Sequence, residues 1–304
     1  MRWDDFRRSD NVEDSRGDEG GGFGGGGIGI PVGGGGLGIG TVILLGLIGW
    51  ALGIDPSVLI GGAELVNSGG HYQQPYEQPA QRTGAPKDQM GDFVAAVLGN
   101  TEDTWTEIFA NSGQQYRVPR LRLYSGAIQG GCGFAQAAMG PFYCPNDRRV
   151  YLDTSFFRDM RERFHGCSGK GCEFAEAYVI AHEIGHHVQN LLGILPKAQD
   201  AQRAAGSKAE ANRIQVRVEL QADCLAGVWA HHSNQRWNSL EPGDVEAALQ
   251  TAAAIGDDRL QQQSRGYVVP DAFTHGSSAQ RQQWFTIGLK EGKVSACNTF
   301  AGSV

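Results

Sequence analysis

The sequence predicts an α+β fold, because patterns typical of strands come first in the folded part of the chain and long helical patterns follow them. Residues 116–126, "YRVPRLRLYSG", alternate as a strand does. From Glu173 onward, apolar residues recur at helical spacing over long stretches. Separate runs of strands and helices are typical of α+β folds rather than of a doubly wound sheet.

Composition divides the chain into four parts. Residues 1–27 are charged and then glycine-rich, which predicts a disordered tail. Residues 28–54 carry no charge and end in 18 mostly apolar residues, which predicts a transmembrane helix; a buried glycine-rich core helix is the alternative. Residues 55–87 are polar with Pro and Gly, as in a stalk, so we expect the folded domain at 88–304.

Basic residues predict how this span is oriented. The four arginines before it are Arg2, Arg7, Arg8 and Arg16, and the first basic residue after it is Arg82. Because basic residues favour the cytoplasmic side, we expect a single-pass protein of the cell inner membrane, with a cytoplasmic N-terminus and a periplasmic domain.

The cysteines agree with an oxidising compartment. All six follow the predicted span: Cys132, Cys144, Cys167, Cys172, Cys224 and Cys297. An even number on one side favours disulfides. Closeness in sequence suggests Cys132 with Cys144 and Cys167 with Cys172, which leaves Cys224 for Cys297, although six cysteines allow 15 connectivities.

The elements follow in order along the domain. Helical spacing predicts a helix from residue 90 and a second, short helix capped by Asn100. After the strand at 116–126, residues 132–156 predict an edge strand, a turn and a strand at 149–153. Helices are expected at about 173–192, ended by Gly193 and Pro196, and at about 208–232. Two more follow residue 244 and Ser277.

A metal-binding pattern lies within the helix at 173–192. His182 and His186 are four residues apart, so both imidazoles lie on one helix face and can bind one ion. Glu183 lies beside them, where it can take a proton from a water molecule, as in metallopeptidases. His187 lies about 100° around the helix from His186 and is expected to be a surface or supporting residue.

Glu219 and Asp223 are four residues apart within an apolar stretch of the next long helix. Buried carboxylates need a cation or a donor. We therefore expect Glu219 as the third zinc ligand and Asp223 as the acceptor for the N–H of a ligating histidine. The alternative is that both face solvent.

Two further features leave alternatives open. His275 precedes a helix cap at Ser277, or enters the cleft as an oxyanion donor. Asp257 and Asp258 form a helix-end turn or support the site. No serine nucleophile motif is present, and a net charge of −7 makes nucleic acid an unfavourable partner.

From about residue 88 to residue 300, the chain resembles the bacterial family described as putative neutral zinc metallopeptidases. The similarity rests on six stretches: "GPFYCPNDRRVYLD", "AYVIAHEIGHHVQ", "VELQADCLAGVWA", "AIGDDRL", "THGSSAQR" and "CNTF". It implies a zincin-like domain, in which a small N-terminal sheet packs on metal-binding helices. It also implies one Zn²⁺ per chain on His182, His186 and Glu219, with Glu183 as the base. By analogy with other zincins, residues 133–138 would receive the peptide as an added strand.

These observations predict a membrane-anchored zinc endopeptidase that cleaves peptide bonds of extracytoplasmic proteins. The alternative is a non-catalytic, metal-stabilised module that binds envelope proteins. The partners expected are a peptide or protein substrate and the membrane, and the sequence leaves the oligomeric state open.

Overall fold

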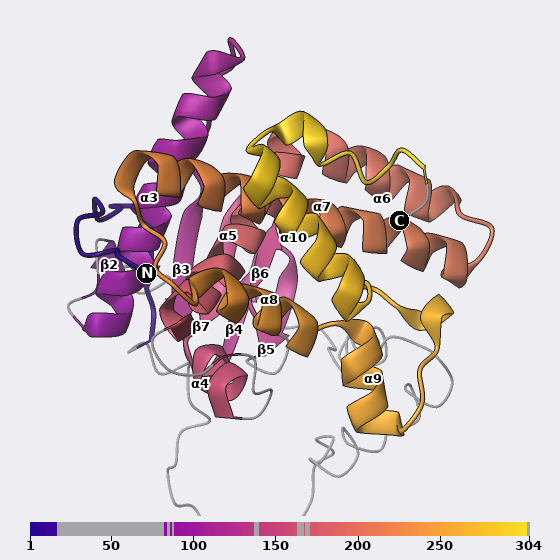
Figure 1. The fold of residues 1–304 in the computed structure, drawn as a ribbon. Coiled ribbons are helices and arrows are strands. Elements are labelled where there is room, and N and C mark those ends of the chain that lie inside the picture. The colour runs from indigo at the N-terminus through magenta and orange to yellow at the C-terminus, as the bar shows by residue number, and fades with distance from the viewer. Residues whose placement is uncertain are drawn as a thin grey trace, which may run out of the picture. The chain divides into compact units, whose positions relative to one another are not determined.

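The computed structural model (Figure 1) describes residues 1–16, 82–83, 86, 88–136, 140–162, 167 and 171–302. A five-stranded sheet gathers segments that are far apart in sequence. Its order is β2 (Arg82–Thr83), β1 (Val12–Asp14), β3 (Arg120–Tyr124), β7 (Arg149–Asp153) and β6 (Phe142–Cys144). The three middle strands are parallel, and β2 and β6 are antiparallel edges. A separate hairpin pairs β4 (Ala127–Gly130) with β5 (Gly133–Gln136).

Helices cover this sheet, so the expected α+β class is observed. The longer ones are α3 (Gln89–Asn111), α5 (Cys172–Leu191), α7 (Lys208–Trp237) and α10 (Ser278–Glu291). The shorter ones are α4 (Ser155–Glu162), α6 (Ile194–Ala204), α8 (Asp244–Ala254) and α9 (Asp257–Arg265), with 3₁₀ turns at Pro270–Ala272 and Val294–Ala296. α5 packs against β6 and against α7, and α10 packs on α7 (Figure 1). The two helices that carry the candidate metal ligands are therefore direct neighbours.

Three sequence signals for helix boundaries have different outcomes in the structure. Ser277 caps α10 through a reciprocal pair of hydrogen bonds with Gln280, as expected. Asn100 does not start a new helix: it is buried within the continuous α3, and its side chain accepts a hydrogen bond of 2.8 Å from the indole of Trp229. Pro196 does not exclude a helix, because it lies in the first turn of α6, where its missing N–H is not needed.

Glycines allow α5, α7 and α10 to approach closely. A Cβ atom on Gly185 would lie 3.0 Å from the carbonyl oxygen of Ala222 in α7. A Cβ atom on Gly288 of α10 would lie only 1.9 Å from the carbonyl oxygen of Cys224 in α7, which any larger residue would have to push away. The close contact at Gly185 lies between His182 and His186 in sequence, so it brings α7 up to the two histidines.

Residues 1–16 belong to the folded unit, so the predicted disordered tail at 1–27 is wrong for this part. Val12 of β1 is fully buried, and Trp3 packs edge-on against Phe93 of α3. Glu13 is 1% exposed and is paired with Arg120 at 2.8 Å and Arg149 at 3.3 Å. Composition failed here because the segment is too polar to fold alone, while α3 and the sheet supply the apolar surface and the countercharges.

The predicted span at 28–54 lies outside the described residues, as does nearly all of the predicted stalk. Among the helices that the structure describes, none is long and apolar enough to cross a bilayer. Moreover, β1 precedes the predicted span, β3 follows it, and the two strands are hydrogen-bonded neighbours. A single crossing between them would put them on opposite sides of a membrane. The predicted single-pass arrangement, with the domain behind one transmembrane helix, is therefore corrected.

Three disulfides link elements around the centre of the domain. The pairs are Cys132–Cys144, Cys167–Cys172 and Cys224–Cys297, as closeness in sequence suggested. No cysteine in the described part of the chain is free. Disulfides persist in oxidising surroundings, so they indicate an extracytoplasmic compartment.

Candidate metal centre

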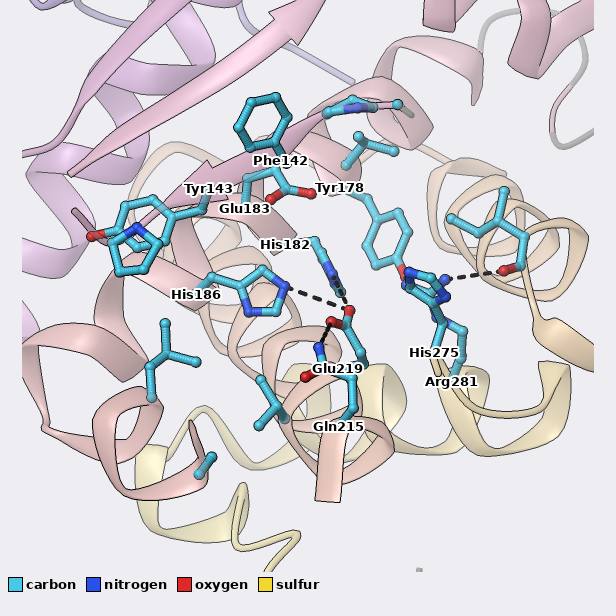
Figure 2. Close-up of a pocket in the computed structure, with 18 of the residues that line it drawn as sticks. Phe142, Tyr143, Tyr178, His182, Glu183, His186, Gln215, Glu219, His275 and Arg281 are labelled. Atoms are coloured by element: carbon cyan, nitrogen blue, oxygen red, sulfur yellow. Dashed lines mark hydrogen bonds and ion pairs between the residues drawn. The ribbon is translucent and has the colours of Figure 1, made fainter. Parts of the chain in front are cut away.

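The structure brings His182, His186 and Glu219 together. The two histidines project from one face of α5 toward Glu219 of α7 (Figure 2). Oε2 of Glu219 lies 3.2 Å from Nε2 of His182 and 3.5 Å from Nε2 of His186. One ligand atom from each of the three residues lies within 4.8 Å of the others. Two imidazole nitrogens and one carboxylate oxygen are the donor set of a zinc site that keeps one position open.

Asp223 orients His182, as expected from the sequence. Its Oδ1 lies 2.8 Å from Nδ1 of His182 and also accepts a hydrogen bond of 2.6 Å from the hydroxyl of Tyr178. Because a carboxylate only accepts, Nδ1 of His182 carries a proton, and Nε2, the nitrogen that faces Glu219, is the one left to bind a metal. Arg281 of α10 donates to both oxygens of Asp223, at 2.8 and 2.9 Å, and balances its charge.

Gln189 orients the imidazole of His186 through its Nδ1, as Asp223 orients that of His182. Its Oε1 lies 2.9 Å from Nδ1 of His186, and its amide nitrogen donates to the carbonyl oxygen of Val218 at 2.8 Å and to Gln221 at 2.9 Å. Gln189 is fully buried, and both ends of its amide are bonded. These bonds fix the amide so that its oxygen faces the imidazole, which again leaves Nε2 of His186 free to bind a metal.

Glu219 is held by a chain of two glutamines. Gln215, one turn earlier on α7, donates a hydrogen bond of 2.7 Å to Oε1 of Glu219. Gln202 of α6 donates to Gln215 at 2.8 Å. The other oxygen of Glu219, Oε2, is the one that faces the histidines. Each of the three candidate ligands therefore has a supporting side chain, as is usual in metal sites.

The local charges favour a cation at this position. Burial lowers the pKa of His182, but the charge and hydrogen bonds of Asp223 and Glu219 outweigh it and raise the pKa to about 10. Burial raises the pKa of Glu219, but the charge of His186 and the hydrogen bonds from both histidines hold it well below its usual value. A site that attracts protons this strongly also attracts a divalent cation, which competes with them for the same nitrogens.

The three side chains line a cavity of about 510 Å³. Glu183 also lines it, 7% exposed, and lies on the side of the imidazoles toward Phe142 (Figure 2). Among the described residues, its carboxylate has no hydrogen-bond partner. The carboxylate of Glu183 thus faces the cavity without another partner there, and its role as the base stays a prediction.

His275 reaches the cavity from the side opposite His186 (Figure 2). The loop that carries it is fixed by Asp257, whose Oδ2 accepts the backbone N–H groups of Thr274, His275 and Gly276 at 2.6, 2.5 and 3.0 Å. Oδ1 of Asp257 lies 3.4 Å from Nδ1 of His275. Both roles left open for His275 are therefore compatible with the fold, because it lines the cleft and also precedes the cap at Ser277.

The strand that lines the cavity is β6, and residues 133–136, the described part of the predicted peptide-binding segment at 133–138, do not line it. Residues 133–136 form β5, which pairs with β4 in the separate hairpin, and Phe134 is 60% exposed. β6 is an edge of the main sheet, and its Phe142 and Tyr143 line the cavity. The sequence could not distinguish the two, because both segments have strand character and either could be the edge.

Four supporting residues were not found from the sequence: Gln189, Gln202, Gln215 and Arg281. Two of them had a local signal, since Gln189 is three residues after His186 and Gln215 four before Glu219. Arg281 is four residues before the buried Phe285, on the buried face of α10. Their partners lie on other turns and helices, so helical spacing alone could not assign a role.

Comparisons with known proteins identify the family of the chain. The family described as "Putative neutral zinc metallopeptidase" matches residues 1–300. An Escherichia coli protein described as "Uncharacterized protein YpfJ" is 48% identical over the whole length of both chains. An uncharacterized Mycobacterium tuberculosis protein is 43% identical over 83% of this chain and 85% of its own. No solved structure matches. The chain therefore belongs to the neutral zinc metallopeptidase family that this match defines.

Proposed function

We propose that this protein is a zinc-dependent endopeptidase that cleaves proteins outside the cytoplasm. The observation that carries the proposal is the convergence of His182, His186 and Glu219 in one cavity, with Glu183 beside them. Membership of the family supports peptide hydrolysis as the reaction class. The disulfides support the compartment.

His182, His186 and Glu219 would hold one zinc ion per chain. Zinc supplies a Lewis acid that lowers the pKa of a water molecule and polarises the carbonyl group of a substrate. Asp223, Gln189 and Gln215 each hold one ligand in a fixed orientation. This support keeps the ligands in place before an ion arrives, which favours tight binding.

Glu183 would act as general base and then as general acid. Its carboxylate accepts a proton from the water molecule as the oxygen attacks the scissile carbonyl carbon. The same carboxyl then donates that proton to the leaving amine, so that the residue returns to its starting state. Its position on α5, next to His182 in sequence, keeps it beside the attacking water throughout.

His275 would stabilise the oxyanion that develops on the carbonyl. Its Nδ1 faces Thr274 and Asp257, at 3.0 and 3.4 Å, which leaves Nε2 for the substrate. Burial lowers the pKa of His275, but the hydrogen bond to Asp257 and the charge of Glu219 outweigh it and raise the pKa. An imidazole N–H is a good donor to a developing negative charge.

The substrate would lie as an added strand along β6. β6 is an edge strand beside the cavity, and main-chain hydrogen bonds to such an edge bind peptides of many sequences. Of the described residues that line the cavity, Arg281 is the one arginine or lysine, and its guanidinium is bonded to Asp223. Nothing there is placed to bind a terminal carboxylate, which favours cleavage within a chain.

The test uses the full-length protein and reduced, carboxymethylated albumin as an unfolded secreted substrate. We expect fragments with new internal amino termini, which disappear when 1,10-phenanthroline removes the metal and reappear when zinc is added back. Albumin that is bound but left uncut by the zinc-loaded protein would instead support the non-catalytic binding module.

A further inference from the structure

His187, the third histidine of "HEIGHH", is fully buried and faces away from the metal ligands. Its Nε2 lies 2.6 Å from the carbonyl oxygen of Arg117, and its Nδ1 lies 3.0 Å from the hydroxyl of Tyr143 on β6. Asn190, three residues later on α5, donates a hydrogen bond of 3.0 Å to the same hydroxyl oxygen. Two side chains of the metal-binding helix therefore meet at one tyrosine of the edge strand.

The positions of the protons follow from these contacts. A carbonyl oxygen only accepts, so the Nε2 of His187 carries a proton. With this proton on Nε2, the other ring nitrogen, Nδ1, is the acceptor of the neutral imidazole. The hydroxyl of Tyr143 must then donate to Nδ1, while its oxygen accepts from Asn190. This hydroxyl thus both donates and accepts a hydrogen bond within the contact between α5 and β6.

The same tyrosine forms part of the cavity wall. β6 is bonded to β7 on one side only, so the main sheet restrains it less than an inner strand. Within the described residues, Tyr143 is the side chain of β6 that is hydrogen-bonded to α5. Its contacts with His187 and Asn190 therefore set where the substrate strand lies relative to Glu183.

We propose that Tyr143, His187 and Asn190, the α5–β6 link, are positioning residues that hold the substrate-binding edge strand in register with the metal-binding helix. The role in substrate binding rests on the proposed function, whereas the effect on β6 does not. Because the side chains of the link are hydrogen-bonded neither to the ligand side chains nor to that of Glu183, its loss should weaken substrate binding and leave metal binding and the chemical step intact.

The structure offers a matched control in Tyr116. Its ring packs on His187 at 5.6 Å, much as that of Tyr143 does at 5.3 Å. Both tyrosines are buried, but the hydroxyl of Tyr116 has no hydrogen-bond partner among the described residues. Tyr143→Phe and Tyr116→Phe each remove a hydroxyl group from a tyrosine that packs on His187. Only Tyr143→Phe also removes hydrogen bonds.

The experiment compares the two full-length variants with the wild type in three measurements: zinc per chain, hydrogen exchange of the backbone amides of β6 at 142–144, and kcat and KM for one peptide. For Tyr143→Phe we expect an unchanged zinc content and hydrogen exchange in β6 that is at least tenfold faster. KM should rise about tenfold while kcat stays within twofold, because the variant loses an interaction that binds the substrate and the transition state equally. Tyr116→Phe should match the wild type. Asn190→Ala, at a partly exposed site, should shift exchange and KM less, in the same direction.

Equal exchange rates in Tyr143→Phe and Tyr116→Phe would overturn the proposal. So would a loss of zinc and of kcat in Tyr143→Phe with KM unchanged, since the link would then support the metal site and not the strand. If the wild type itself cleaves no peptide, the proposed function fails, and the exchange rates still decide whether the link positions β6.

Discussion

Arg281 and Asp223 form a buried, two-pronged ion pair beside the metal centre, with N–O distances of 2.8 and 2.9 Å. Arg281 is 3% exposed and Asp223 is fully buried. Asp223 also fixes His182, so this pair connects α10 to the metal-binding face of α5 through α7. Charge balance and ligand orientation thus depend on one carboxylate.

Asp223→Ala should therefore destabilise the protein strongly. It leaves Arg281 buried without a countercharge, which costs about 3–5 kcal/mol of unfolding free energy. The double variant Asp223→Ala with Arg281→Met removes both charges and should recover part of that loss. Urea denaturation with a chelator present measures both, so that metal binding does not contribute. A double variant no more stable than Asp223→Ala would contradict the charge-balance explanation.

Glu219→Gln should remove most of the bound zinc. The wild type should bind about one zinc per chain, and the amide cannot replace the charge of the carboxylate. Glu210→Gln is the control, because Glu210 lies in the first turn of the same helix. Elemental analysis of full-length protein purified without added metal measures the ratio. Equal zinc in Glu219→Gln and Glu210→Gln would exclude Glu219 as a ligand.

Glu183→Gln should retain zinc and lose peptide hydrolysis by a factor of at least about 10². An amide of the same size cannot accept the proton of the attacking water. Glu173→Gln, in the first turn of α5, should leave the rate unchanged. Zinc content and initial rates on a single peptide give both results. A rate near that of the wild type would rule out Glu183 as the base.

Gln189→Leu should weaken zinc binding by about 10- to 100-fold, which is typical for the loss of a group that orients a ligand. Without its amide, the Nδ1 of His186 loses its acceptor. Gln199→Leu is a suitable control. Gln199 lines the same cavity but is not hydrogen-bonded to any of the three candidate metal ligands. Competition with a zinc-binding dye gives the affinities. If both variants bind zinc equally well, the orienting role is refuted.

His187 should make the protein less stable in acid. Burial lowers its pKa to about 4, whereas an unfolded histidine titrates near 6.5. As pH falls from 6.5 to 4, the unfolded chain takes up this proton and the folded chain does not, so stability decreases by up to about 3 kcal/mol. His187→Gln cannot titrate and should lack this part of the pH dependence.

Urea unfolding of metal-free wild type and His187→Gln at pH 7 and pH 4.5 measures this effect. The raised pKa values of His182 and His186 change the free energy of unfolding in the opposite direction as pH falls. The wild type and His187→Gln both have these two histidines. The difference between the two proteins therefore isolates His187. If the two lose the same free energy between these pH values, His187 is not the group responsible.

Local patterns predicted much of the fold and the centre of the site. The spacing of His182 and His186 was enough to predict that both rings lie on one face of α5. The cap at Ser277 was enough to predict where α10 begins. The apolar surroundings of Glu219 and Asp223 predicted that both carboxylates face inward, and both are buried. These features depend on neighbours within a few residues, which sequence spacing records directly.

Local sequence patterns could not predict contacts between segments that are distant in the chain. The N-terminal residues fold only because α3 and the sheet bury Trp3 and pair with Glu13. Composition described the segment at 1–27 in isolation and predicted a tail, and hydropathy predicted a single membrane crossing at 28–54. The pairing of β1 with β3 corrects the first for residues 1–16, and corrects the single crossing.

The sequence by itself thus determined that α5, α7 and α10 form and which faces of α5 and α7 carry the metal-binding side chains, because helical geometry repeats every few residues. Only the tertiary structure decided what meets those faces. Gly185 brings α7 close enough for Glu219 to complete the set, Arg281 arrives from α10, and Tyr143 arrives from β6. These partners are set by packing between elements far apart in the chain, and no local spacing encodes that packing.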